Sequence, residues 1–139
     1  MPWLILMLGV SRCSVDRAAI RSDEQEQKHL QDSAEEYWHA VRWGYAERAA
    51  VFVEQDVDRS RHHMQLEAEL ETQRYTDVTV LRVTVIAPED PAQPDANGHW
   101  RTGEVVVFTE GYTLPAQIVQ RQERTQQWYR TTDGWFVSP

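Results

Sequence analysis

The chain lacks the features by which many functions are recognised in a sequence. Its 139 residues include a single cysteine, Cys13, and one thiol cannot form an internal disulfide, so no disulfide framework stabilises the fold. It has no glycine-rich phosphate loop and no nucleophile elbow, the motifs of phosphate-binding enzymes and of serine hydrolases. No apolar run is long enough to span a bilayer as a helix. No motif in the sequence therefore identifies a reaction.

Basic residues are too few and too scattered to bind a phosphate backbone. The formal net charge is −8 at pH 7. Residues 14–74 contain fourteen acidic and eight basic side chains, and residues 75–139 contain eight and five. A nucleic acid would be repelled, and no basic stripe offsets that repulsion. We therefore expect no nucleic-acid partner, and we interpret the acidic helices as solvated faces.

The composition that remains is that of one folded domain. Hydrophobic residues make up 41% of the chain and aromatic residues 10%, which argues against global disorder. A chain of 139 residues suits a single core. The six tryptophans are many for this length, and rings of that size either fill a core or line a groove. A core position is the simpler interpretation.

The N-terminal segment has the pattern of an export signal. Met1–Val10 is an apolar run with the length of a signal-peptide core. Leu8–Cys13 resembles the bacterial lipoprotein motif, in which the cysteine becomes the lipidated first residue of the mature protein. This resemblance implies a signal over residues 1–13, a polar tether over 14–23, and an envelope location reached through Cys13. The alternatives are a cytoplasmic protein whose first residues pack on the core or fray, and an uncleaved interfacial anchor.

Hydrophobic spacing predicts three helices in the first half of the chain. The first follows a capping-box spacing at Ser22–Gln25 and ends at Gly44, which can adopt the left-handed conformation of a helix C-terminus. A short helix is predicted over 45–53 and a third over about 56–73. The third is the least amphipathic, so we expect it at the surface. The core-facing stripe of the first helix consists of Leu30, Ala34, Tyr37 and Val41, with Trp38 beside it.

β-branched residues replace the helical pattern from Tyr75 onward. The first strand ends at Ile86, and its alternation slips near Leu81–Arg82, which predicts a bulge or sharp bend. A proline-rich loop over 88–97 is long for a hairpin and is either mobile or a lid. Residues 24–139 are therefore expected to form one α+β domain, with N-terminal helices packed on a strongly curved antiparallel sheet of about four strands. The remaining strands are predicted over Arg101–Tyr112, Gln117–Arg130 and Trp135–Val137.

The order of these elements is similar to a known architecture. Tyr37–Tyr45 looks like a first helix with a glycine break, Tyr45–Ala50 like a small second helix, and Gln127–Val137 like a closing hairpin. Together they resemble the nuclear-transport-factor-two-like superfamily of cone-shaped domains, which includes polyketide-cyclase-like proteins, over residues 24–138. The resemblance implies a cone-like sheet and pairing of two copies through their sheets. Because this superfamily contains isomerases, dehydratases, cyclases and non-catalytic accessory domains, it does not select a function.

An enzyme of this cone type needs an ionisable group inside the apolar hollow, where burial moves the pKa toward neutrality. Asp77 and Glu110 are the carboxylates nearest to the predicted hollow, which makes them the candidate bases, although solvation at the sheet rim is the simpler interpretation of both. Arg82 would hold an anionic ligand if it pointed inward, whereas an exposed edge position is simpler. The residues expected to line a ligand pocket are Tyr37, Tyr45, Arg82, Phe108 and Trp128.

We expect no metal site and no cofactor. Glu36 and His39 have the Glu-x-x-His spacing of di-iron bundles, but those bundles need a second copy and two further glutamates. His62 and His63 are adjacent and point about 100° apart on a helix, so they do not share one ion. Cys13 has no catalytic base near it in the sequence, and we interpret it as a lipidation site.

Three hypotheses of function follow. The first is a non-enzymatic, envelope-associated binding or accessory domain for a partner protein or a small apolar ligand. Its working surface would be the loop over 88–97 or a concave sheet bearing Phe108, Tyr112, Trp128 and Tyr129. The second is a small cone-fold enzyme of the isomerase, dehydratase or cyclase kind that transfers a proton in an apolar pocket. The third is an accessory subunit that docks through its N-terminal segment, and a homodimer formed through the sheet is compatible with each.

Overall fold

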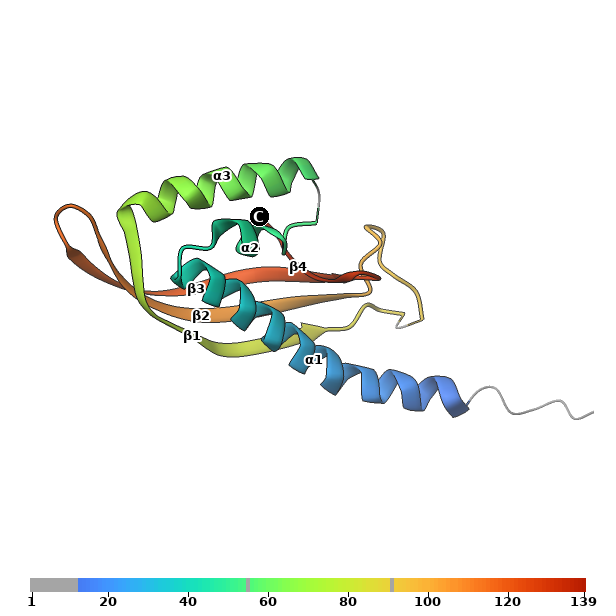
Figure 1. The fold of residues 1–139 in the computed structure, drawn as a ribbon. Helices are drawn as coiled ribbons and strands as arrows, with labels where there is room; N and C mark the ends of the chain where they lie inside the picture. The colour runs from blue at the N-terminus through green and yellow to red at the C-terminus, as the bar shows by residue number, and fades with distance from the viewer. Residues whose placement is uncertain (1–12, 55, 91) are drawn as a thin grey trace, which may run out of the picture.

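The fold consists of three helices followed by a four-stranded antiparallel sheet (Figure 1). The computed structural model describes residues 13–54, 56–90 and 92–139. The strands pair in chain order, β1-β2-β3-β4, which confirms the predicted α+β class. The helices are α1 (Cys13–Arg42), α2 (Ala46–Ala50) and α3 (Asp56–Thr72), and the strands are β1 (Gln73–Ile86), β2 (Arg101–Thr113), β3 (Ile118–Thr131) and β4 (Gly134–Val137).

α1 is longer than the sequence predicted. It begins at Cys13 and spans 30 residues, so the segment 14–23, expected as a tether, is helical. The physical reason is that no glycine or proline interrupts this segment, and a capping-box spacing does not by itself stop a helix from extending backward. Residues 1–12, which hold most of the predicted signal, lie outside the described residues. None of the helices that the structure describes is long and apolar enough to cross a bilayer.

The C-terminal end of α1 lies at the glycine that the sequence predicted. Gly44 has a φ of 77°, in the left-handed region that glycine adopts without steric cost. Its N–H donates to the carbonyl of Val41 at 3.2 Å, and the N–H of Tyr45 donates to the carbonyl of Ala40 at 2.8 Å. This pair of bonds is a Schellman motif, which caps the last carbonyls of the helix. The turn leaves Trp43 and Tyr45 exposed on either side of the glycine.

β1 contains the irregularity predicted near Leu81. Its pairing with β2 shifts register between Val80 and Arg82, and again between Tyr75 and Asp77. An extra residue in one strand bends that strand and increases its twist. The two shifts therefore curve β1 around the helices that it faces.

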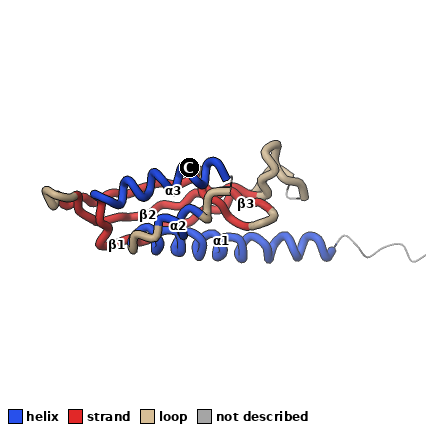
Figure 2. Tube along the Cα trace, turned by 45° about the horizontal axis from the view of Figure 1, so that its top comes forward, coloured by secondary structure: helices blue, strands red, loops and turns tan. Residues whose placement is uncertain are grey.

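The core lies between α1 and one face of the sheet. Figure 2 shows α1 and α3 each running along the length of the sheet. The predicted apolar stripe of α1 is buried, and it packs with Val105 and Val107 of β2 and with Trp128 of β3. The rings of Tyr37 and Trp128 meet edge to face, with centroids 5.9 Å apart. Two buried aromatic side chains thus join the helix layer to the sheet.

Gly103 of β2 is a point of close approach between α1 and the sheet. A Cβ added there would overlap the Leu30 Cδ2 atom and lie 3.1 Å from the Trp135 ring. Alanine normally stabilises a strand interior by about 0.5–1 kcal/mol relative to glycine, whereas overpacking costs about 1–3 kcal/mol. We therefore predict that Gly103→Ala lowers the free energy of unfolding, measured by urea denaturation.

A double-mutant cycle tests the cause of that loss. Leu30→Ala alone leaves a cavity and costs about 2–5 kcal/mol, but it also removes the atom that the new methyl group meets. Gly103→Ala should therefore cost less in the Leu30→Ala background than in the native chain. Equal costs in the two backgrounds would contradict this packing.

Candidate functional site

Two hollows lie beside α3. The first, here named the polar cleft, has a volume of about 290 Å³ and is bounded by α1, α3, β1 and β3. The second, named the aromatic groove, has a volume of about 1140 Å³ and is bounded by the α1–α2 turn, α3 and the first residues of β1. Tyr75 borders both hollows. The polar cleft is defined by Tyr37, Trp38, His62, Glu69, Arg124 and Gln126, and the aromatic groove by Arg42, Trp43, Tyr45, Arg48, Arg74 and Tyr112.

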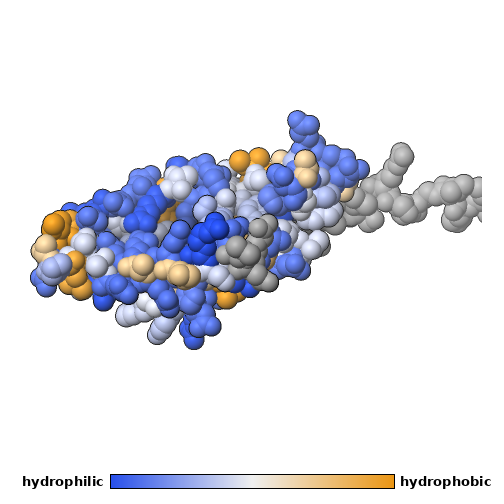
Figure 3. All heavy atoms as spheres, turned by 90° about the horizontal axis from the view of Figure 1, so that it is seen from above, coloured by the Kyte–Doolittle hydropathy of each residue, from blue (hydrophilic) through white to orange (hydrophobic). Residues whose placement is uncertain are grey.

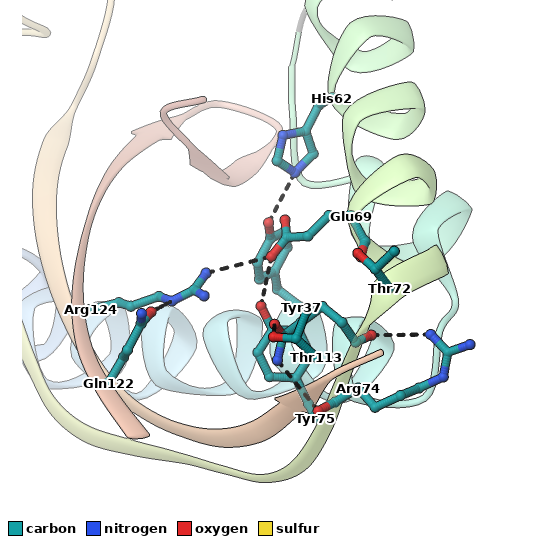
Figure 4. A network of polar contacts seen from close by, with 10 residues as sticks. Tyr37, His62, Glu69, Thr72, Arg74, Tyr75, Thr113, Gln122 and Arg124 are labelled. Carbon is teal, nitrogen blue, oxygen red and sulfur yellow. Dashed lines mark hydrogen bonds and ion pairs between the residues drawn. The ribbon is translucent and has the colours of Figure 1, made fainter. Parts of the chain in front are cut away.

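Two hydrogen bonds cross the polar cleft from α3 to the body of the domain (Figure 4). The hydroxyl of Tyr37 on α1 lies 2.9 Å from Nε2 of His62. The hydroxyl of Tyr75 on β1 donates to Oε1 of Glu69 at 2.8 Å. His62 and Glu69 are seven residues apart, two helical turns, so they lie on the same side of α3. The two bonds therefore fasten one side of this helix to α1 and to the sheet.

Arg124 of β3 projects into the same cleft. Its guanidinium carbon lies 5.8 Å from the ring centroid of Trp38 and 5.7 Å from that of Tyr75, and its Nε donates to Gln122 at 3.2 Å. Its Nη1 atom is 3.9 Å from Oε1 of Glu69, which is too long for a hydrogen bond. The rings, Gln122 and this long ion pair with Glu69 thus orient the guanidinium at the cleft, where it also acts on the Tyr75 hydroxyl.

Gln126, two residues further along β3, is oriented by two indoles. Its Oε1 atom accepts a hydrogen bond from Nε1 of Trp38 at 2.9 Å and a longer one from Nε1 of Trp128 at 3.4 Å. An indole N–H can only donate, so the side-chain oxygen must face the indoles. The amide nitrogen points away from them and toward the Tyr37 hydroxyl, whose pKa the Gln126 side chain acts to lower.

Burial determines the ionisation of the polar cleft. Burial, reinforced by the charge of Glu69, holds the pKa of Tyr37 well above its ordinary value of 10.0. Burial and the hydrogen bond to Glu69 raise the pKa of Tyr75 to about 12. Burial also lowers the pKa of His62 from 6.5. At neutral pH both phenols are therefore protonated and the imidazole is neutral.

This arrangement favours binding over proton transfer. A general base needs a free proton acceptor within reach of its substrate. Nε2 of His62 is engaged with the Tyr37 hydroxyl, and Oε1 of Glu69 accepts from Tyr75. The side chain of Glu69 is 43% exposed, so it is a solvated charge rather than a buried base.

The aromatic groove differs from the cleft in the exposure of its rings. Trp43 is 57% exposed and Tyr45 is 49% exposed. The guanidinium carbon of Arg42 lies 5.2 Å from the Trp43 ring, and that of Arg48 lies 4.9 Å from the Tyr45 ring. Cation–π pairs of this kind hold the rings in place by covering one face, while about half of each side chain remains in water.

The predicted ligand-binding residues do not line one pocket. Tyr37 lies in the polar cleft and Trp128 is fully buried in the core, whereas Tyr45 lies in the aromatic groove. Phe108 was expected to line the pocket, and this is corrected: it pairs with Thr79 on the face that no described helix covers. Arg82 pairs with Val106 on the same face and is exposed, so it has the edge position that the sequence made the simpler interpretation and not the pocket position. The bulge at Leu81 explains Arg82, because the extra residue turns it away from the face that Val80 occupies.

The two candidate bases also lie outside both hollows. Asp77 and Glu110 are register partners on the uncovered face of the sheet. Asp77 is exposed, and Glu110 pairs with Arg121 at 2.9 Å. Asp77 is thus in solvent and the half-buried Glu110 is in an ion pair, so neither carboxylate has an apolar environment.

Sequence reasoning missed several residues of the polar cleft: His62, Glu69, Arg124 and Gln126. A signal was present for each pair. His62 and Glu69 share one side of a predicted helix, and Arg124 and Gln126 alternate along a predicted strand, so each pair faces one way. What the sequence did not contain was which side of α3 faces the sheet.

Comparison with known proteins gives one structural match. No protein-family model and no curated sequence matches the chain at a significant level. The chain superposes on the solution structure of RPA3114, a SEC-C motif containing protein from Rhodopseudomonas palustris, with a TM-score of 0.52 and 14% identity. The match covers 73% of this chain and 69% of the other. At this identity the two proteins are similar in fold.

This match corrects the family resemblance drawn from the sequence. The matched protein contains a SEC-C motif and belongs to a different fold family from the nuclear-transport-factor-two-like domains. The stretches that suggested the resemblance are a helix with a glycine end, a short helix and a closing hairpin. Such pieces occur in many α+β folds, because each satisfies a local rule of helix ending or strand turning. Here an open sheet follows all three helices.

His62 gives the fold a pH dependence of known sign. Because burial lowers its pKa below the unfolded value of 6.5, the unfolded chain binds the proton more tightly. The stability that the neutral ring contributes is therefore present above pH 6.5 and is lost as the pH falls through the lower folded-state value. We predict that His62→Gln flattens the fall in the free energy of unfolding below pH 6.5, measured by urea denaturation at each pH.

His63→Gln is the matched control. His63 is the next residue on α3, borders the aromatic groove, and pairs with Glu67 at 3.1 Å. Because His63 lies outside the polar cleft, His63→Gln should leave the fall in the free energy of unfolding below pH 6.5 as it is in the native chain. If the free energy of unfolding lost its pH dependence in the His63 variant and kept it in the His62 variant, the assignment of this dependence to His62 would be wrong.

Proposed function

We propose that the chain is a non-enzymatic binding domain that engages a partner protein through the aromatic groove. The proposal rests on the exposure of Trp43 and Tyr45, at 57% and 49%, beside a concave surface. Large rings left in water gain free energy when a partner covers them. Trp, Tyr and Arg are also the residues that most often dominate the energy of protein interfaces, and Arg42 and Arg48 stack on these two rings.

The charges of the groove favour a partner that presents apolar side chains. Three arginines on its rim are offset by three glutamates, so the groove has no net field to attract a strongly charged ligand. A mixed polar rim around aromatic residues is the usual composition of a protein interface. The rim residues are Arg42, Arg48, Arg74, Glu47, Glu67 and Glu71.

The alternative function, a proton-transfer enzyme in an apolar pocket, has less support. Its candidate bases, Asp77 and Glu110, lie on the uncovered face of the sheet. In the polar cleft, Nε2 of His62 and Oε1 of Glu69 already take part in hydrogen bonds, and the rest of the Glu69 carboxylate is a solvated charge. Binding requires neither a shifted carboxylate nor a free imidazole, and for this reason we favour it.

Partner binding should depend on the two exposed rings. The partner is identified by comparing proteins cross-linked to the native chain and to the Trp43→Ala/Tyr45→Ala variant in the native host, and its affinity is then measured with the purified pair. Truncating a dominant interface ring costs about 2 kcal/mol or more. Each single substitution is therefore expected to weaken binding by about 30-fold or more.

The β2–β3 hairpin provides the matched control. Ile118 and Val119 are 59% and 63% exposed, and Figure 3 shows hydrophobic atoms gathered at the end of the molecule where this hairpin lies. Ile118→Ala/Val119→Ala removes a similar exposed apolar area without touching the groove. Binding that survives loss of the two rings and is lost in the hairpin variant would refute the groove as the docking site.

We further propose that a lipid on Cys13 anchors the chain to the bacterial envelope, as the N-terminal pattern predicts. At 1.5 Å per residue, the 30 residues of α1 span about 45 Å from Cys13 to Arg42. Figure 1 shows the N-terminal part of this helix projecting past the sheet. An anchor at Cys13 would thus leave the aromatic groove, at the opposite end of α1, open to a partner.

The anchor has a direct chemical test. The N-terminal peptide of protein purified from the native host should begin at Cys13 and carry a diacylglycerol mass on its sulfur. Cys13→Ser should move the protein from the membrane fraction to the soluble fraction, because serine provides no thiol for the thioether bond. An intact Met1 in the native preparation would remove the anchor from the proposal and leave the groove untouched.

A further inference from the structure

We propose that the polar cleft is a binding site for a small amino-carboxylate zwitterion, of which a free α-amino acid is the simplest member. The ligand's carboxylate would lie on Arg124 and Gln126, and its ammonium group on Glu69. This site differs from the aromatic groove, which borders another side of α3 and shares only Tyr75 with the cleft.

Arg124 and Gln126 form the carboxylate half of the site. The guanidinium is held by two aromatic rings and by Gln122. Its Nη1 atom faces Glu69 at 3.9 Å, which is too long for a hydrogen bond, so a carboxylate that binds there replaces a weak ion pair. The amide of Gln126 is oriented by two indole donors that take its oxygen. Two pre-oriented donors on alternate residues of one strand face the same way, and a guanidinium fork is the side chain best matched to a carboxylate.

Glu69 forms the ammonium half. Its Oε1 atom accepts from Tyr75, and the second carboxylate oxygen has no hydrogen-bond donor among the described residues. The distance from Glu69 Oε1 to Arg124 Nη1 is 3.9 Å. In an α-amino acid the ammonium nitrogen and carboxylate carbon are about 2.5 Å apart, from bond lengths of about 1.5 Å and a tetrahedral angle. A zwitterion bound beside Glu69 and Arg124 can therefore place its ammonium group near the Glu69 carboxylate and its carboxylate near the Arg124 guanidinium.

The cleft also has room and apolar wall for a side chain. Its volume of about 290 Å³ includes Trp38, Tyr75 and the buried Leu66 in its lining. The Glu69 and Arg124 side chains are 43% and 37% exposed, so a ligand reaches both charges from solvent without opening the core. An amino acid with an apolar or aromatic side chain fits this combination of charged mouth and apolar wall.

A ligand panel separates the two halves of the site. Phenylalanine, 3-phenylpropionate (which lacks the ammonium) and phenethylamine (which lacks the carboxylate) are titrated into the full-length protein at millimolar concentration by calorimetry, with intrinsic tryptophan fluorescence as a second readout. We expect phenylalanine to bind at least tenfold more tightly than either analogue. Equal affinities for phenylalanine and 3-phenylpropionate would overturn the proposal. So would the absence of binding by all three compounds and by leucine, a second amino acid with an apolar side chain.

Two substitutions test the assigned roles. Glu69→Gln keeps an acceptor for Tyr75 but removes the charge, so it should abolish the preference for phenylalanine over 3-phenylpropionate. Arg124→Gln should abolish the preference for phenylalanine over phenethylamine. Glu67→Gln and Arg121→Gln, on the far side of α3 and on the uncovered sheet face, should leave both preferences as they are, and far-ultraviolet circular dichroism checks that each variant is folded. Preferences that persist in the Glu69 and Arg124 variants would refute the site.

Discussion

The close approach of α1 to the sheet is the constraint on which the rest of the structure depends. At Gly103 the strand has no side chain, and Leu30 and Trp135 occupy that space. Two turns further along the helix, the Tyr37 ring packs edge to face on Trp128. These contacts hold the helix from Leu30 onward, so the Schellman turn at Gly44 fixes where α2 and α3 begin. The same part of α1 forms one wall of the polar cleft, through Tyr37, Trp38 and Val41.

α3 is attached by a different balance of forces. Of its described apolar side chains, Leu66 is buried and Leu70 partly buried, while Met64 is exposed. Burying one large side chain contributes about 1.5–3 kcal/mol, and each hydrogen bond, such as those of His62 and Glu69, adds about 0.5–1.5 kcal/mol. Because α3 makes few apolar contacts, its side chains do not interdigitate closely with those of the domain. Its polar side chains stay hydrated, so space remains beside the helix. The hollows on both sides of α3 are therefore a consequence of how the helix is held.

Features that depend on local pattern were predicted from the sequence, and features that depend on which surfaces meet were not. The buried stripe of α1, the glycine that ends it and the bulge near Leu81 each follow from spacing or from one residue's conformational freedom. The same bulge places Arg82 on the face opposite to Val80, the exposed position that the sequence made the simpler interpretation. Phe108 ends a run of valines with no alternation, and such a run does not indicate which face is inward.

The polar cleft escaped detection because no single stretch of chain contains it. Its side chains come from α1, α3, β1 and β3, and a sequence motif records only neighbours along the chain. Tyr75 borders both hollows, and its hydroxyl holds Glu69 of α3. Any displacement of α3 therefore changes the shape of the cleft and the groove together. Removing α3 would therefore destroy both hollows at once. Substituting side chains on one side of the helix changes one hollow alone, so only such variants can separate the roles of the polar cleft and the aromatic groove.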